Sequence, residues 1–163
     1  MKKFELTNEF VTNMFGTKLF RIRALVEFGD VEAGELGGYV EKESNLGHDD
    51  NAWVYDNAWV YGNAQVFGDA RVCGDARVCS NGDYAYAHGF GSVNRTTTFF
   101  RLKDGGVGVR CGCFYGTFAQ FRDKIRETHG ETKKAQEYLM LADLMELRFE
   151  EDENEVGNRK YVE

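Results

Sequence analysis

The feature that most constrains this chain is a repeat with a period of six residues. From Asn51 onward the sequence reads NAWVYD, NAWVYG, NAQVFG, DARVCG and DARVCS. Each unit opens on Asn or Asp, with alanine at its second position and valine at its fourth. Six residues suffice for one short strand and one turn, whereas a helix repeats its apolar face about every 3.6 residues. The repeat therefore predicts short stacked strands.

Three such units make one triangular coil of about 18 residues, which is the geometry of a left-handed parallel β-helix. In that geometry the valines point inward, the small alanines fit the corners, and Gly, Asn or Asp take the turn backbone. We therefore predict a mainly β chain with a short left-handed parallel β-helix of two to three coils. Gly37 to Val40 and Leu46 supply an earlier, looser coil, and Arg21 to Val31 a further strand or an N-terminal cap.

A spacing of about 18 residues also determines which outward side chains stack along one face. It places Trp53 over Arg71 and Trp59 over Arg77, and both are cation–π arrangements. The same outward aromatic row includes Tyr55, Tyr61 and Phe67. Because monomers rarely expose an apolar patch of this size, we expect either a subunit interface or a ligand groove lined by aromatic and arginine side chains. The two interpretations are compatible if the groove lies between subunits.

After the repeat, the pattern changes to a hairpin followed by two helices. Thr96 to Leu102 and Val107 to Phe114 are extended runs, and the Gly-containing segment between them is a typical hairpin turn. Thr117 is a plausible N-cap, and apolar residues at helical spacing follow it as far as Gly130. A second helix is expected from about Glu131 to Phe149. We predict that this unit, a β-hairpin with two C-terminal α-helices, caps the last coil.

These patterns predict four parts. They are N-terminal strands or a cap (residues 1–36), the left-handed β-helix (37–88), the hairpin plus two-helix cap (89–149) and an acidic tail (150–163). The tail carries six acidic and two basic residues, so most of the net charge of −7 lies there. We expect it to be a solvated terminus.

Composition and charge exclude several classes of function. No basic stripe is present to neutralise the phosphates of duplex DNA. The N-terminal residues lack the apolar core of a signal peptide, and no run approaches the roughly 18 apolar residues of a membrane span. The four cysteines are expected to be free thiols in a reducing cytoplasm. Cys111 and Cys113 lack the paired C-x-x-C spacing of a zinc site, so we predict neither a metal nor a cofactor.

Histidine is the general base expected of an acyltransferase, which this architecture often hosts. The chain has three histidines, His48, His88 and His129, and none lies inside the hexads. Their wide spacing does not match the three zinc-bound histidines of γ-type carbonic anhydrases. His129 is expected at a helix C-terminus, where the dipole favours it. Only His88 lies next to the end of the repeat, so we expect no catalytic residue and no enzyme, with a His88-dependent acyltransferase as an alternative.

Arginines are the more informative polar residues. Arg71 and Arg77 belong to the repeat, and Arg95, Arg101 and Arg110 lie on or beside the hairpin. Each can be a solvated strand residue, or together they can bind an anion bidentately while an aromatic ring stacks on a base. On the second interpretation the ligand-binding residues are Trp53, Trp59, Arg71, Arg77, Arg95, Arg101 and Arg110.

Three segments together carry a resemblance to a known group of proteins. They are FRIRALVEFGDVEAGELGGYVE (Phe20–Glu41), NAWVYGNAQVFGDARV (Asn57–Val72), and FRLKDGGVGVRCGCFYGTFAQF (Phe100–Phe121) with Thr128–Gly130. Over about residues 18–149 the chain resembles uncharacterised bacteriophage and prophage proteins with left-handed β-helix hexapeptide repeats. The resemblance implies a phage origin and a homotrimer, and it assigns no activity and no catalytic residue.

A chain of this kind, without catalytic residues but with outward aromatic and arginine side chains, is expected to act by binding. The first hypothesis is a non-enzymatic phage counter-defence protein that, as an oligomer, sequesters a small anionic nucleotide-type immune signal or blocks a host defence protein. The second hypothesis is a structural or assembly module whose aromatic residues hold subunits together. The acyltransferase-like enzyme is the third.

Overall fold

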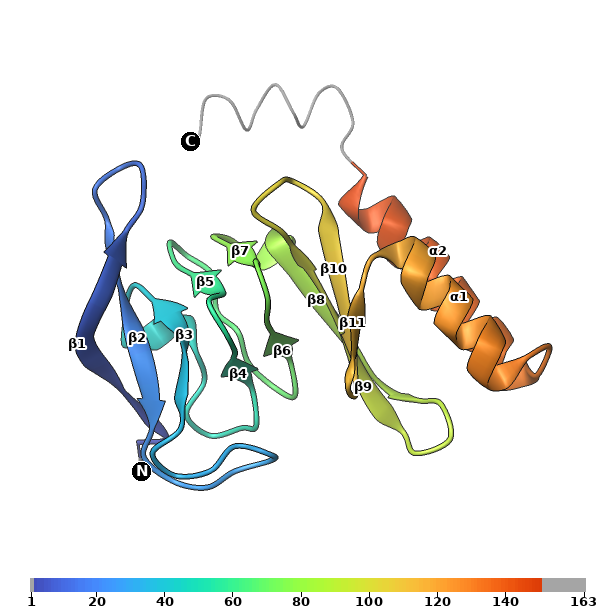
Figure 1. Ribbon diagram of the computed structural model, residues 1–163, viewed down its shortest axis with the longest axis horizontal. Coiled ribbons are helices and arrows are strands. Elements are labelled where there is room, and N and C mark those ends of the chain that lie inside the picture. Colours follow the sequence, from blue (N-terminus) through green and yellow to red (C-terminus); the bar gives the residue numbers. More distant parts are fainter. Residues whose placement is uncertain (1, 151–163) are drawn as a thin grey trace.

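The computed structural model describes residues 2–150, which form a mainly β protein with two helices at the C-terminal end of that range. Figure 1 shows four layers side by side: an N-terminal β-hairpin, the repeat segment, an antiparallel sheet and a helix pair. The predicted acidic tail lies outside the described residues except for Glu150. Within the described range, no helix combines the length and apolar character needed to cross a membrane.

The N-terminal layer is an antiparallel hairpin that leads into the repeat segment. Its strands β1 (Phe4–Thr12) and β2 (Lys18–Ala24) pair with each other, and β3 (Leu36–Val40) pairs antiparallel with β2. On its other side β3 pairs in parallel with the repeat strand β5 (Trp59–Val60). The hairpin therefore continues directly into the stacking of the repeats.

The repeat segment (residues 51–80) forms short parallel strands at the predicted spacing. Strand β5 pairs with β7 (Arg77–Val78), and β4 (Trp53–Val54) pairs with β6 (Arg71–Val72), in each case with partners 18 residues apart. A further parallel bridge joins Leu46 to Val66. The valines of the five units are 0% exposed and the alanines at most 1%, so the predicted inward positions are confirmed.

The last position of each of the first four units makes the turn, as the composition predicts. Asp56, Gly62, Gly68 and Gly74 recur every six residues, and their φ values lie between 56° and 71°. Residues other than glycine rarely adopt this left-handed backbone conformation, which explains why glycine occupies three of the four positions. Asp56 is the exception, and its carboxylate accepts a hydrogen bond from the backbone N–H of Gly74 at 3.1 Å.

A four-stranded antiparallel sheet lies between the repeats and the helices. Its order is β11-β10-β9-β8, formed by β8 (Tyr84–Phe90), β9 (Arg95–Arg101), β10 (Val107–Cys111) and β11 (Phe114–Gly116). The predicted hairpin is confirmed as β9 and β10. Residues 84–88, expected in the last coil, instead belong to β8, because they pair antiparallel with β9.

Both faces of this sheet are buried, so it joins two cores. Tyr84 and Phe100 contribute to the core inside the repeats. Phe99 and Val109 point to the opposite face and pack against the helices. The alternation of side chains along a strand produces this division.

The two helices begin and end close to the predicted positions. Helix α1 (Phe118–His129) has Thr117 as N-cap, whose side chain accepts a hydrogen bond from the backbone N–H of Gln120. It ends at Gly130, which has a φ of 59°. Helix α2 (Lys133–Phe149) begins two residues later than expected, because the Thr132 side chain caps it.

The predicted outward row of aromatic side chains is wrong at Trp53. This side chain is 0% exposed, and its ring lies 5.2 Å from Phe28 and 6.3 Å from Phe4. The N-terminal layer covers this face of the repeats, which a period of six residues does not reveal. Along the rest of the row, Tyr55, Trp59 and Tyr61 are half-buried and Phe67 is exposed.

Candidate ligand-binding site

Two of the predicted arginines meet in one cavity between the repeats and the antiparallel sheet. We call it the junction cavity; its volume is about 410 Å³, and its polar side chains are Asn51, Asp69, Arg71, His88, Asn94, Arg95 and Thr96. Arg71 lies on β6, next to the inward Val72, so its side chain points out of the repeat. Arg95 is the first residue of β9 and directly follows the turn residue Asn94.

Hydrogen bonds fix the two elements that carry these arginines against each other. The backbone N–H of Arg71 donates to the hydroxyl of Thr98 on β9 at 3.0 Å. The Arg71 guanidinium also forms an ion pair at 3.2 Å with Asp30, which lies in the loop between β2 and β3. Asp30 in turn accepts a hydrogen bond from the Tyr55 hydroxyl at 2.8 Å. These contacts therefore hold Arg71 in place. A bound anion would have to compete with the Asp30 carboxylate for the Arg71 guanidinium.

His88 lies in the same cavity but lacks the arrangement of a catalytic base. Its Nδ1 lies 2.7 Å from the Thr96 hydroxyl and 3.8 Å from the Asp69 carboxylate. In a catalytic triad the nucleophile and the acid bind opposite nitrogens of the imidazole, whereas here both neighbours face the same nitrogen. The His88 side chain is also 57% exposed. This geometry favours a polar contact with a ligand over acid–base catalysis.

The other predicted site residues lie elsewhere. Arg77 stacks on Trp59 with its guanidinium carbon 3.9 Å from the ring centroid, so this predicted cation–π pair is confirmed. Arg71 lies opposite Trp53 in the strand register, yet its guanidinium pairs with Asp30.

Two further arginines of the prediction have structural contacts. Arg101 donates to the backbone carbonyl of Phe149 at 2.6 Å, at the end of α2. Arg110 lies over the ring of Tyr55, 4.5 Å from its centroid. The structure thus brings together Arg71 and Arg95 of the seven predicted residues and places the other five outside the lining of the junction cavity.

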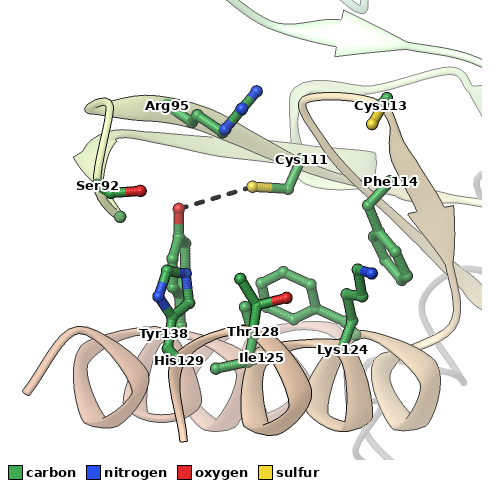
Figure 2. Close-up of a pocket in the computed structure, with 12 residues that line it drawn as sticks. Ser92, Arg95, Cys111, Cys113, Phe114, Lys124, Ile125, Thr128, His129 and Tyr138 are labelled. Atoms are coloured by element: carbon green, nitrogen blue, oxygen red, sulfur yellow. Dashed lines mark hydrogen bonds between the residues drawn. The ribbon is translucent and has the colours of Figure 1, made fainter. Parts of the chain in front are cut away.

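A second cavity of about 200 Å³, which we call the cap cavity, lies between the helices and the other face of the sheet. Figure 2 shows Lys124, Thr128, His129 and Tyr138 rising from α1 and α2, with Cys111 and Arg95 across from them. The Arg95 guanidinium points away from the helices in this view. Arg95 therefore separates the two cavities and lines both of them.

Tyr138 is the most buried polar group of the cap cavity. It is 2% exposed, its hydroxyl lies 3.7 Å from the Cys111 sulfur, and its ring stacks on that of His129. Burial, and to a lesser degree Cys111, raises the pKa of Tyr138 well above its ordinary value. The hydroxyl therefore stays protonated and able to donate a hydrogen bond.

Sequence reasoning missed the cap cavity because its residues also fit structural roles. Tyr138 belongs to the apolar face of the second helix, and His129 was expected at a helix C-terminus, where it is found. The one available signal was the spacing of Lys124 and Thr128, which places both on one side of α1. No disulfide joins Cys111 or Cys113 to another cysteine in the described residues.

No family model matches this chain, and no curated protein matches it.

Proposed function

We propose that this chain is a phage counter-defence protein that binds and sequesters a small nucleotide-type anion in the junction cavity, without chemistry. The observation that carries the proposal is the convergence of Arg71 and Arg95 in one cavity from separate layers of the fold. Guanidinium groups bind phosphate bidentately and keep their charge at any physiological pH. Two of them on one cavity therefore favour a ligand that carries phosphate.

The remaining lining supports a nucleotide over a bare phosphate. Asp69 can accept a hydrogen bond from a sugar hydroxyl, as acidic residues do in dinucleotide sites. Asn51 and Asn94 offer amides that both donate and accept. The volume of about 410 Å³ also lies within the range of roughly 300–1,000 Å³ usual for small-molecule sites.

Base recognition in this proposal does not involve the tryptophans. Trp53 is buried, Trp59 is stacked on Arg77, and neither lines the junction cavity. The proposed ligand is therefore held by its phosphate and sugar, with the base recognised through polar groups. This predicts modest discrimination between bases and strong discrimination against nucleosides.

Equilibrium dialysis against a panel of mono-, di- and cyclic nucleotides tests the proposal. We expect at least one nucleotide to bind saturably and its nucleoside to bind far more weakly. Arg71→Ala and Arg95→Ala should each weaken binding roughly tenfold or more, because each removes a charge-assisted contact.

Arg77→Ala is the matched control, because Arg77 occupies the same position in the next hexad but lies outside the cavity. It should leave nucleotide affinity unchanged. Absence of binding across the panel would remove the proposal, and an equal loss in Arg71→Ala and Arg77→Ala would remove the junction cavity as its location.

Two finer expectations belong to the same proposal. The parallel pairs 18 residues apart and the left-handed turn residues every six residues support coils of a left-handed parallel β-helix. Proteins with such coils are commonly homotrimers, and we propose that state here. A crystal structure tests the handedness, and sedimentation equilibrium tests the trimer.

A further inference from the structure

The cap cavity, on the helix side of the antiparallel sheet, has a charge pattern that the proposed nucleotide site does not use. Lys124 and His129 of α1 both line it, and no acidic side chain is among its described lining residues. Glu127 is the acid paired with Lys124, at 3.9 Å, and its side chain is 74% exposed. An exposed pair at that distance is weak, so the cavity favours an anion.

Hydroxyl groups add neutral donors to the Lys124 ammonium and the His129 ring. Ser92, Thr128 and Tyr138 line the cavity, each with a hydroxyl group. The Tyr138 hydroxyl contacts the Cys111 sulfur at 3.7 Å, and sulfur is a weak acceptor. The Tyr138 hydroxyl can therefore donate instead to a stronger acceptor such as a phosphate oxygen.

The backbone is shaped to leave room for this hydroxyl. Gly91 has a φ of 80°, and a Cβ atom there would overlap the hydroxyl oxygen of Tyr138. Any other residue at this position would be strained and would displace the tyrosine. The arrangement of the loop between β8 and β9 thus keeps the Tyr138 hydroxyl at the wall of the cavity.

Size and apolar lining limit what can bind. The volume of about 200 Å³ is below the range of roughly 300–1,000 Å³ typical of drug-sized ligands. Phe114, Phe121 and Ile125 form an apolar wall on one side. The cavity therefore suits a compact molecule that carries an anionic group and an apolar group.

We propose that the cap cavity is a second binding site, separate from the junction cavity, for a compact organic phosphate monoester. Lys124 and His129 face its phosphate, the hydroxyls of Thr128 and Tyr138 donate to the phosphate oxygens, and Phe114 and Phe121 contact its organic part. A phosphate monoester has three terminal oxygens, which can accept hydrogen bonds from donors on both helices, whereas a planar carboxylate has two.

Isothermal titration calorimetry with phenyl phosphate tests this site on the full chain. We expect saturable binding, weakened roughly tenfold by Lys124→Gln through loss of a charge-assisted hydrogen bond. Tyr138→Phe should weaken binding severalfold, because it removes the hydroxyl and keeps the ring packing.

Lys134→Gln is the matched control, because Lys134 is an exposed lysine of α2 outside the cavity. It should leave the affinity for phenyl phosphate unchanged. Phenol is the ligand control, and it should bind much more weakly because it lacks the phosphate.

Thiol alkylation locates the binding. Cys113 is exposed and lines the cap cavity, whereas Cys79 lies in the repeat segment. Phenyl phosphate should slow the reaction of Cys113 with iodoacetamide and leave that of Cys79 unchanged, as read by mass spectrometry of the peptides.

The outcomes separate this site from the nucleotide site. Arg71→Ala should leave phenyl phosphate binding intact, so loss of nucleotide binding in that variant leaves the cap-cavity proposal standing. No saturable binding of phenyl phosphate, equal losses in Lys124→Gln and Lys134→Gln, or equal affinity for phenol would overturn it.

Discussion

At the scale of single residues, the candidate site depends on how Asp30 and a ligand compete for Arg71. The ion pair is 3.2 Å long, but the two side chains are 31% and 52% exposed, so water weakens it. Asp30→Asn removes the competing charge and keeps an acceptor for the Tyr55 hydroxyl. We expect this variant to bind the nucleotide severalfold more tightly, as measured by equilibrium dialysis.

Glu32→Gln is the control for this prediction, because it makes the same charge change at an exposed position of the same loop. Its affinity should match that of the unaltered protein. An equal gain in both variants would mean that overall charge, and not the Asp30–Arg71 pair, governs binding.

Buried tyrosine and cysteine residues make the stability of the fold sensitive to alkali. Burial raises the pKa of Tyr84 to about 12 and that of the Cys73 thiol to about 11. A group whose pKa is raised on folding stabilises the protein fully below its unfolded pKa, and this contribution is lost as pH rises through the folded pKa. For Tyr84 the window runs from pH 10 to about pH 12.

Urea unfolding at a series of pH values checks this directly. The free energy of unfolding should fall as pH rises through that window. In Tyr84→Phe the slope of this fall against pH should be smaller by the equivalent of about one bound proton. The same slope in both proteins would show that Tyr84 does not carry the effect.

Some contacts of single residues could be predicted from the sequence, and others could not. The inward valines, the turn glycines and the Trp59–Arg77 stack follow from the period of six residues and are confirmed. Burial of Trp53 does not follow, because Phe4 and Phe28 reach it from segments without a repeat. For the same reason, the sequence pattern does not indicate that Arg71 and Arg95 meet.

At the scale of elements, one buried lysine helps to hold the N-terminal layer against the repeat segment. The Lys3 ammonium donates to the backbone carbonyls of Asp50 and Ala52, at 3.0 and 2.7 Å, and to the Asp50 carboxylate at 3.2 Å. Lys3→Met keeps the aliphatic stem but leaves these acceptors without their donor. We expect it to lower the free energy of unfolding by about 2–3 kcal/mol in urea unfolding.

The neighbouring lysine supplies the control. Lys2 pairs with Glu43 at 3.0 Å, but its side chain is 66% exposed. Lys2→Met should change stability by less than about 1 kcal/mol. Similar effects of the two substitutions would contradict the anchoring role of Lys3.

Elements differ in how well their patterns identify them. Apolar residues at helical spacing indicate both helices, and Thr117 marks the start of α1, so their bounds are predicted within two residues. Strand β8 falls largely within the bounds of the predicted β-helix (37–88), although no hexad covers its residues. Its pairing with β9 depends on a hairpin turn at residues 91–94, which lacks a typical two-residue turn signal.

At the scale of the whole molecule, the antiparallel sheet contributes side chains to both cores, so we expect them to unfold together. Phe100 packs into the repeat core and Phe99, its neighbour on β9, into the helix-side core. Both tryptophans lie in the repeat segment, so their fluorescence reports on the first core, while far-ultraviolet circular dichroism reports on the helices. We expect the two probes to give coincident thermal transitions.

Phe99→Ala tests the coupling, because it alters the helix-side core. It should destabilise the protein by about 3–5 kcal/mol and lower the transition seen by tryptophan fluorescence as much as that seen by circular dichroism. A fluorescence transition that stays in place while the helices melt earlier would mean that the layers unfold independently.

Native mass spectrometry of the purified protein tests whether it sequesters a nucleotide-type signal. The protein is prepared from a host with active nucleotide-signalling defence and from a host without it. We expect an oligomer that carries the added mass of a nucleotide only from the first host, and no added mass in Arg71→Ala. The same unliganded mass from both hosts would contradict it.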